Sequence, residues 1–264
     1  VTKFDGLALR GDMAGDRISS NPVSGERIKN EIIYEFCHAL KSHVDVQAYL
    51  PSLLFLNGKY WGLYNLMERK GIDFIKGNHG IDEIDMLSEN NRLVSHGDED
   101  HFDRMLSYVE SYDMTESNNY QQVLKWIDVL SFIDYWVFEC YCGAHDHEVN
   151  IRYWRPKTPE GKWRWISFDM DSWREWDHDI FEYYFGEDEE EVLLLPQLLK
   201  NKEFFNLFGN RMCDMLNTGM SSTNAAGLIK KITQKIEPEV DRERQRWAKE
   251  HRYVEKRAQI ARFT

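Results

Sequence analysis

The chain has 264 residues, of which 42% are hydrophobic, so it can form one large domain or two small ones around a sizeable core. Its 14 Phe, 13 Tyr and 9 Trp residues exclude an intrinsically disordered chain, and no apolar run reaches the roughly 18 residues that a membrane-spanning helix needs. The net charge of −12 argues against a general nucleic-acid-binding protein, because such proteins gain affinity by neutralising phosphates.

The first two predicted elements are a helix and a hairpin. Apolar residues recur with a helical period over Gly25–Leu40, which predicts a helix with one buried stripe. The β-rich runs Tyr49–Leu56 and Tyr60–Met67 flank an Asn-Gly-Lys step at residues 57–59. Asn and Gly both tolerate positive φ, so this step predicts an antiparallel hairpin.

The middle of the chain is first polar and then becomes strongly apolar. From Gly71 to about Asn119 the composition is polar, and we expect a connector with only a short helix near Phe102–Val109. A wide apolar face then predicts a single core-crossing helix over Tyr120–Cys142 that ends at Gly143. The four cysteines are too few for a disulfide scaffold, and we expect buried free thiols.

The next segment combines an acidic loop with a second hairpin. Residues 143–150 form a polar loop, Ile151–Trp154 alternates like a strand, and residues 158–161 read as a turn. Trp163–Phe168 is a second strand, and Asp169-Met170-Asp171 follows it directly.

This order brings acidic groups together at one end of the hairpin. A two-stranded ribbon places the residues before its first strand beside those after its second strand. If Asp169 and Asp171 stay extended, their side chains project to the same side and, with the Asn150 amide oxygen, form a hard-oxygen site for Mg²⁺ or Mn²⁺. Asp146 would lie close to the metal and remain free to accept a proton.

The same arrangement builds a protein-kinase catalytic centre, in which a loop Asp positions the attacking hydroxyl while an Asn and a later Asp hold metals. Over nearly its whole length the sequence resembles the spore-coat CotH kinase family. The most distinctive piece is the Asn-Gly-x-Tyr-x-Gly-x-Tyr hairpin that ends in Glu68. The resemblance also rests on Phe4–Gly11 with Asp16, the helix around Arg27–Leu40, Leu56–Glu68, Asp146 with Asn150, Trp165–Asp171, and a final helix with Trp247 and Arg257.

The resemblance implies an α+β fold of the atypical protein-kinase type with two lobes. Residues 1–68 would form a partial N-terminal lobe, and residues 69–264 a mostly helical C-terminal lobe. It implies a kinase that uses ATP with Mg²⁺, or Mn²⁺, to phosphorylate Ser or Thr of a protein, with basic Ser-rich segments as substrates. An extracytoplasmic, cell-surface or spore-coat location is favoured by the resemblance alone.

The resemblance also assigns roles to residues. Asp146 would be the catalytic Asp, Asn150 and Asp169 would be metal ligands, and Asp171 would be a second ligand or a support. Glu68 would lie near the inter-lobe hinge, on the nucleotide side.

Two departures from the family pattern concern the nucleotide site. The family usually has a small residue after its Asp-x-Asp motif, whereas residues 172–176 are bulky here. The family's strands that cover the phosphates normally precede the segment matching Phe4–Arg10, so we expect an incomplete N-terminal lobe with only Lys3 and Arg10 as nucleotide-gripping cations. Arg10 and Arg27 are equally interpreted as surface cations or as partners of Asp12 and Glu31 rather than as phosphate ligands.

Three functions from different classes remain open at this point. The first is ATP-dependent transfer to protein, of phosphate or of AMP or an amino acid. The second is a glycosyltransferase that uses Asp169-x-Asp171 as its metal-diphosphate motif. The third is a catalytically weak surface or adhesion module. The sequence names neither the substrate nor the oligomeric state.

Overall fold

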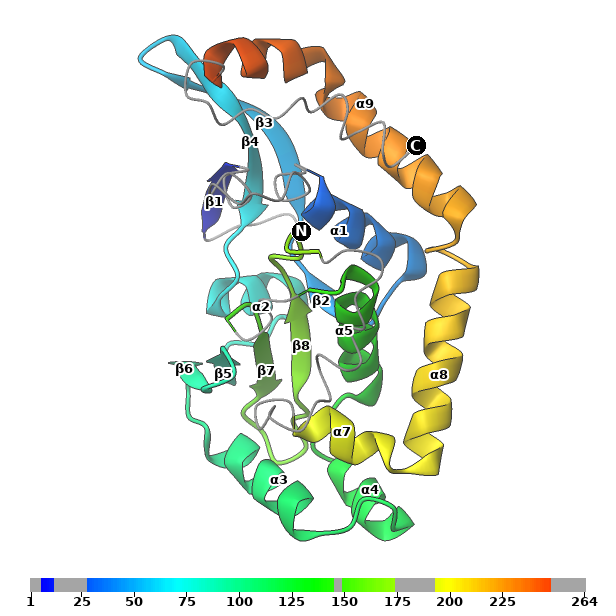
Figure 1. The fold of residues 1–264 in the computed structure, drawn as a ribbon. Helices are drawn as coiled ribbons and strands as arrows, with labels where there is room; N and C mark the ends of the chain where they lie inside the picture. The colour runs from blue at the N-terminus through cyan, green and yellow to red at the C-terminus, as the bar shows by residue number, and fades with distance from the viewer. Residues whose placement is uncertain (1–5, 12–27, 145–148, 174–192, 248–264) are drawn as a thin grey trace.

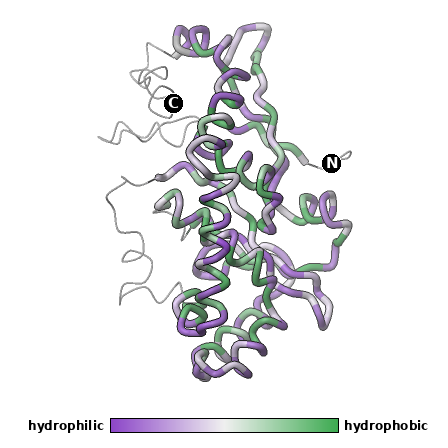
Figure 2. The backbone as a smooth tube through the Cα atoms, turned by 90° about the vertical axis from the view of Figure 1, so that its right-hand side faces the viewer, coloured by the Kyte–Doolittle hydropathy of each residue, from purple (hydrophilic) through white to green (hydrophobic). Residues whose placement is uncertain are grey.

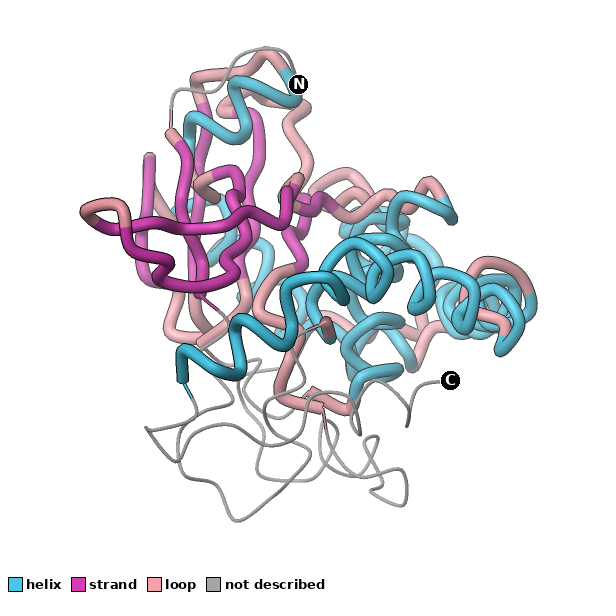
Figure 3. Tube along the Cα trace, turned by 90° about the horizontal axis from the view of Figure 1, so that it is seen from above, coloured by secondary structure: helices cyan, strands magenta, loops and turns pink. Residues whose placement is uncertain are grey.

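The computed structural model describes residues 6–11, 28–144, 149–173 and 193–247, which form an α+β fold (Figure 1). In chain order its elements are β1 (Leu7–Gly11), α1 (Lys29–Leu40), β2 (Asp45–Val46), β3 (Tyr49–Leu56), β4 (Lys59–Glu68), α2 (Ile72–His79), β5 (Ile84–Ser88), β6 (Leu93–His96), α3 (Asp100–Ser111), α4 (Ser117–Val123), α5 (Val129–Cys142), β7 (Arg152–Pro156), β8 (Arg164–Ser167), α7 (Leu194–Leu199), α8 (Lys202–Asn217) and α9 (Ser222–Trp247). Seen from above, the strands gather on one side and most helices on the other (Figure 3).

The predicted helix and first hairpin are confirmed within the described residues. α1 begins at Lys29, and β3 and β4 pair as antiparallel strands up to Leu56 and Lys59. Asn57 and Gly58 have φ values of 51° and 77°, the left-handed conformation that the turn requires. β1 pairs with the other side of β4, which gives a three-stranded antiparallel sheet of order β1-β4-β3.

The prediction of a connector from Gly71 to about Asn119 is wrong, except for its short helix near Phe102–Val109, which lies within α3. This stretch contains α2, β5, β6 and α3, and β5 pairs with both β6 and β7 inside a five-stranded sheet of order β2-β8-β7-β5-β6. All five residues of β5 are buried, including Asp85 and Ser88. A strand covered on both faces shows no apolar–polar alternation, and its polar residues therefore resemble a loop in the sequence.

The five-stranded sheet lies between two hydrophobic clusters, and the alternation along its central hairpin shows why. Tyr153 and Trp165 belong to the larger cluster, which includes α5, while Trp154 and Ile166 belong to a smaller cluster with residues of α2. Successive side chains of a strand point to opposite faces, so the hairpin of β7 and β8 is fixed from both sides. Hydrophobic and hydrophilic residues also interleave along most helices (Figure 2).

The predicted single helix over Tyr120–Cys142 is in fact two helices, α4 and α5. Between them Ile127 forms an isolated parallel bridge with Trp163, and the amide of Asp128 donates to the Trp163 carbonyl at 2.9 Å. Pairing with Trp163, the residue just before β8, therefore interrupts a periodic pattern that is helical by itself. The predicted end of the helix at Gly143 is confirmed, with φ of 56°.

Helix α9 runs back from the C-terminal helices to the first sheet (Figure 1). It contacts α1 and β4, and Glu243 accepts hydrogen bonds from the Leu63 amide at 2.7 Å and the Tyr60 hydroxyl at 3.1 Å. Arg242 lies over the Tyr60 ring at 4.1 Å. The division of the chain at residue 68 stays a prediction, and α9 packs against elements on the N-terminal side of it.

All four cysteines are free, as predicted. Cys37, Cys140 and Cys142 are buried, whereas Cys213 is exposed, so the expectation of buried thiols is wrong for Cys213. Among the helices of the described segments, none is long and apolar enough to cross a bilayer.

Candidate functional site

The candidate site lies where the end of β8 meets β1 of the first sheet. Arg10 of β1 forms an ion pair with Asp169, and the same Nη2 atom lies 3.3 Å from Asp171 Oδ2. The side chains of Arg10, Asp169 and Asp171 are 27%, 26% and 15% exposed, so the cluster is partly shielded and still reachable. Of the sequence-predicted site residues, these three come together.

The Asp-x-Asp segment does not stay extended, which corrects the geometric assumption behind the predicted metal site. Asp169 has φ of 59°, and a turn follows at Met170 and Asp171. The two carboxylates therefore converge on Arg10 through a tight turn rather than through strand alternation. Asp tolerates this left-handed backbone better than most residues because its short polar side chain can bond locally.

Asn30, which sequence reasoning missed, holds this turn from helix α1. Its Oδ1 accepts a hydrogen bond from the Met170 amide at 2.5 Å, and its Nδ2 donates to Asp171 Oδ2 at 3.3 Å. Asn30 is buried, and it is separated from the turn by about 140 residues of sequence. No spacing pattern in the chain links the two, because only the packing of α1 brings them together.

The electrostatics of the cluster favour a charged Arg10. Burial alone would lower the pKa of the guanidinium, but the neighbouring Asp169 and Asp171 outweigh burial and raise it above its ordinary value. Tyr34 of α1 is buried beside these groups, and burial raises the pKa of its phenol. Of the alternative partners considered from the sequence, Asp12 and Arg27 lie outside the described residues, and Glu31 accepts a hydrogen bond from the Asn65 side-chain amide.

Two further cations gather on Phe168, the residue just before Asp169. Lys70 Nζ lies 3.2 Å from the centre of the Phe168 ring, and Arg152 lies 5.7 Å from it. Arg152 Nη1 also donates to the Lys70 carbonyl at 2.5 Å. Burial lowers the pKa of Lys70 to about 7; Asp169 partly opposes this effect, while Arg152 and Arg10 add to it. Sequence reasoning singled out neither Lys70 nor Arg152.

Glu68 occupies the end of β4, immediately before the chain passes to α2. Its carboxylate accepts hydrogen bonds from the Ala48 amide at 2.9 Å and from Asn78 Nδ2 at 3.0 Å, and Gln47 donates to its backbone carbonyl. Glu68 is buried and joins the start of β3 to α2. Its predicted contact with a nucleotide stays a prediction.

The remaining predicted residues lie around the start of β7. Asn150 is half-buried, two residues before β7 begins. Asp146 and Lys3 lie outside the described residues. In the segments that the structure describes, no three His, Cys, Asp or Glu side chains form a ready metal cluster. A cavity of about 510 Å³, lined in part by Phe102, Trp136 and Leu195, contains none of the predicted site residues.

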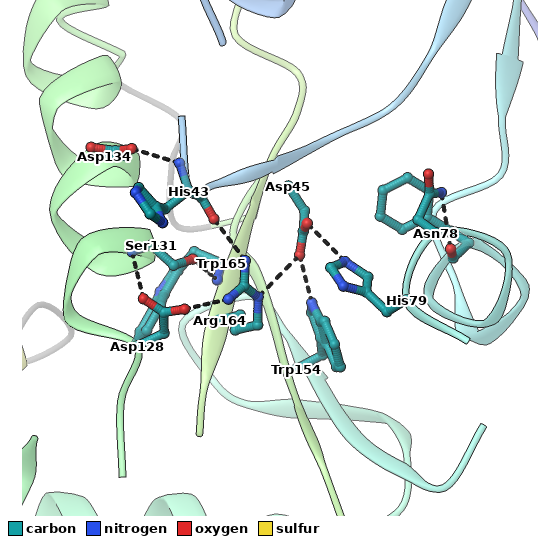
Figure 4. A network of polar contacts seen from close by, with 11 residues as sticks. His43, Asp45, Asn78, His79, Asp128, Ser131, Asp134, Trp154, Arg164 and Trp165 are labelled. Carbon is teal, nitrogen blue, oxygen red and sulfur yellow. Dashed lines mark hydrogen bonds and ion pairs between the residues drawn. The ribbon is translucent and has the colours of Figure 1, made fainter. Parts of the chain in front are cut away.

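A polar network holds the hairpin that carries Asp169 (Figure 4). Asp45 of β2 accepts from Trp154 Nε1 and pairs with His79 Nε2, both at 2.9 Å, and lies 3.7 Å from Arg164 Nε. Arg164 also pairs with Asp128 at the start of α5. The network connects β2, β7, β8, α2 and α5, so the end of β8 has a fixed position.

Comparison with known proteins gives one informative result. A search of curated proteins found no match. The family description "CotH kinase protein" matches residues 21–264, which includes α1, the β3–β4 hairpin, the turn of Asp169 and Asp171, and α9. Because the match covers nearly the whole chain, this protein belongs to the CotH kinase protein family.

Proposed function

We propose that this chain is an ATP-dependent protein kinase that transfers phosphate to Ser or Thr hydroxyls, with basic Ser-rich segments as its substrate class. The observation that carries the proposal is the convergence of Asp169 and Asp171 on Arg10, a cation from the other sheet. Membership of the CotH kinase protein family supports the same reading. The two sheets, joined through the segment after Glu68, support a two-lobed kinase-like arrangement.

The residues present fit a divalent cation. Two carboxylates that already share one cationic nitrogen form a hard-oxygen donor set, and Mg²⁺ is commonly held by one or two carboxylates together with water and substrate phosphates. Asp169, Asp171 and the Asn150 amide would hold Mg²⁺ or Mn²⁺. When bound, such an ion neutralises phosphate charge and orients the transferred group.

Side chains of the protein would supply the other functions of the site. Arg10 holds the two carboxylates together, and Asn30 fixes the turn on which they lie. Asp146 would orient the acceptor hydroxyl and take its proton. Glu68 would face the nucleotide from the end of β4, next to the segment that joins the two sheets.

The transferred group identifies the reaction. The chain is incubated with Mg²⁺, a basic Ser-rich peptide, and ATP labelled at either the γ or the α phosphate. We expect label on Ser from γ-labelled ATP alone. Label from α-labelled ATP would instead indicate AMP transfer, and no label from either, with no nucleotide binding, would indicate a surface or adhesion module.

A variant of Asp146 separates nucleotide binding from phosphate transfer. We expect Asp146→Asn to retain ATP binding while transfer falls by roughly 10²–10⁴, the range for removal of a positioned acid or base. Equal losses in binding and rate would make Asp146 a metal ligand instead.

A further inference from the structure

Lys70 and Arg152 place two positive charges at one aromatic ring. Lys70 lies in the turn between β4 and α2, Arg152 begins β7, and both lie against Phe168. Both are half-buried. The Phe168 ring face offers each cation only about 0.5–2 kcal/mol of attraction, which does not replace a full counter-charge.

In the described part of the chain neither cation forms an ion pair with a carboxylate. Asp169 and Asp171 pair with Arg10, while Asp169 acts on Lys70, and Glu89 on Arg152, only from beyond ion-pair distance. Arg152 donates from Nη1 to a carbonyl, while its Nε is buried and has no hydrogen-bond partner in the described structure. Like charges brought together in a partly dry place are unfavourable unless an anion joins them, so the pair is incomplete as it stands.

The ring that carries the two cations and the acidic pair are adjacent in the sequence. Phe168, which carries the cation pair on its ring, is followed directly by Asp169, which with Asp171 forms the acidic pair. The two carboxylates exceed the single charge of Arg10 by one negative charge. A group with both a divalent cation and phosphate oxygens would offset this excess with its cation and place its oxygens on Lys70 and Arg152. Arg10 is already neutralised by two carboxylates and is the weaker candidate for the phosphate oxygens.

We propose that Lys70 and Arg152 form an anion-binding subsite that takes phosphate oxygens of the nucleotide, in the role that family resemblance gives to Arg10. The identity of the anion as part of a nucleotide rests on the proposed function. The existence of the subsite rests only on the two neighbouring cations and on the absence of an ion pair to either of them among the described residues.

The subsite is tested with tripolyphosphate, measured by isothermal titration without divalent metal on the 264-residue chain. We expect Lys70→Met and Arg152→Met each to weaken tripolyphosphate binding at least tenfold, and Lys70→Arg, which keeps the charge, to weaken it by less than threefold. Lys76→Met is the matched control, because Lys76 is an exposed lysine on α2 whose ion pair within the described segments is with Asp82. It should leave the affinity unchanged. Circular dichroism verifies the fold of each variant. If one Met variant does not fold, the other Met variant and Lys70→Arg still test the subsite.

Parallel titrations with Mg²⁺-ATP separate this proposal from the proposed function. Tripolyphosphate binding that depends on Lys70 and Arg152, without any Mg²⁺-ATP binding, would support the subsite and contradict the kinase assignment. Mg²⁺-ATP binding that is unaffected in both Met variants would overturn the subsite and leave the kinase assignment intact. Failure of the unmodified chain to bind tripolyphosphate would also overturn the subsite.

Discussion

At the residue scale, the candidate site depends on one amide side chain as much as on its charges. The left-handed backbone of Asp169 is held in place because the Met170 amide donates to Asn30 and the Asp171 carboxylate accepts from the same side chain. An amide can do both at once, whereas a carboxylate or an alkyl group cannot. Asn30 therefore positions the acidic pair from a different helix.

Replacement of Asn30 should show this dependence. We expect Asn30→Ala to lower the free energy of unfolding by about 1–3 kcal/mol, because the buried Met170 amide loses its acceptor. Urea denaturation measures the change. Asn91→Ala, at an exposed position before β6, is the control and should change little. An Asn30→Ala protein as stable as the control would show that the contact contributes nothing.

His101 of α3 gives a second residue-scale prediction, on pH. Its Nδ1 accepts from Trp163 Nε1 at 3.0 Å, which requires the neutral ring. Burial, with the nearby cations Arg155 and Arg104, lowers its pKa from 6.5 to about 4. The unfolded chain therefore takes up the proton first, and the stabilising effect is complete above pH 6.5 and is lost as the pH falls toward 4.

This loss can be measured by comparison with a variant that does not titrate. Between pH 7 and pH 4.5 the unmodified protein should lose roughly 1–2 kcal/mol more stability than His101→Gln, which keeps an acceptor for Trp163; the range allows for partial exposure of the ring. Identical pH profiles of the two proteins would exclude this role for His101.

At the element scale, the β7–β8 hairpin is the scaffold of the site. Its two faces belong to different hydrophobic clusters, and the Asp45 network fixes it against β2, α2 and α5 (Figure 4). Asp45 is only 13% exposed at its side chain, and the groups around it depend on it as an acceptor. The position of Asp169 at the end of β8 therefore follows from contacts made along the whole hairpin.

Loss of the Asp45 carboxylate should destabilise this scaffold. We expect Asp45→Ala to lower the free energy of unfolding by about 2–3 kcal/mol, because Trp154 Nε1 loses its acceptor and Arg164 loses a nearby counter-charge. Differential scanning calorimetry should show a melting temperature lower by several degrees. Asp82→Ala breaks an exposed ion pair with Lys76 and should shift the melting temperature little. Equal shifts in the two variants would contradict the network's importance.

The elements show what local sequence can and cannot predict. The Asn57-Gly58 turn, the end of a helix at Gly143 and the β7–β8 hairpin depend on nearby residues, and the structure confirms them. β5 was missed because it is buried on both faces, and the break between α4 and α5 was missed because it depends on pairing with Trp163. Of the candidate site, Asp169 and Asp171 were predicted from the motif, whereas Asn30, Lys70 and Arg152 join them only through packing.

At the scale of the whole molecule, distant parts of the chain cooperate around the site. β1 supplies Arg10 from the beginning of the described structure, and α9 packs on β4 of the same sheet, where Glu243 accepts from the Leu63 amide. The acidic pair comes from the five-stranded sheet. The site therefore forms only when both sheets are held in position. The family match, which begins at residue 21, includes the acidic pair but not β1.

The most direct test of this account is the binding of Mg²⁺-ATP to the unmodified chain and to Asp169→Asn, measured by isothermal titration. Asn keeps the tolerance for φ of 59° and removes the charge, so the fold should be preserved. We predict that the unmodified chain and the exposed control Asp82→Asn bind Mg²⁺-ATP, and that binding by Asp169→Asn is abolished. Equal affinities in all three proteins would contradict the assignment of Asp169 and Asp171 as the metal-nucleotide site.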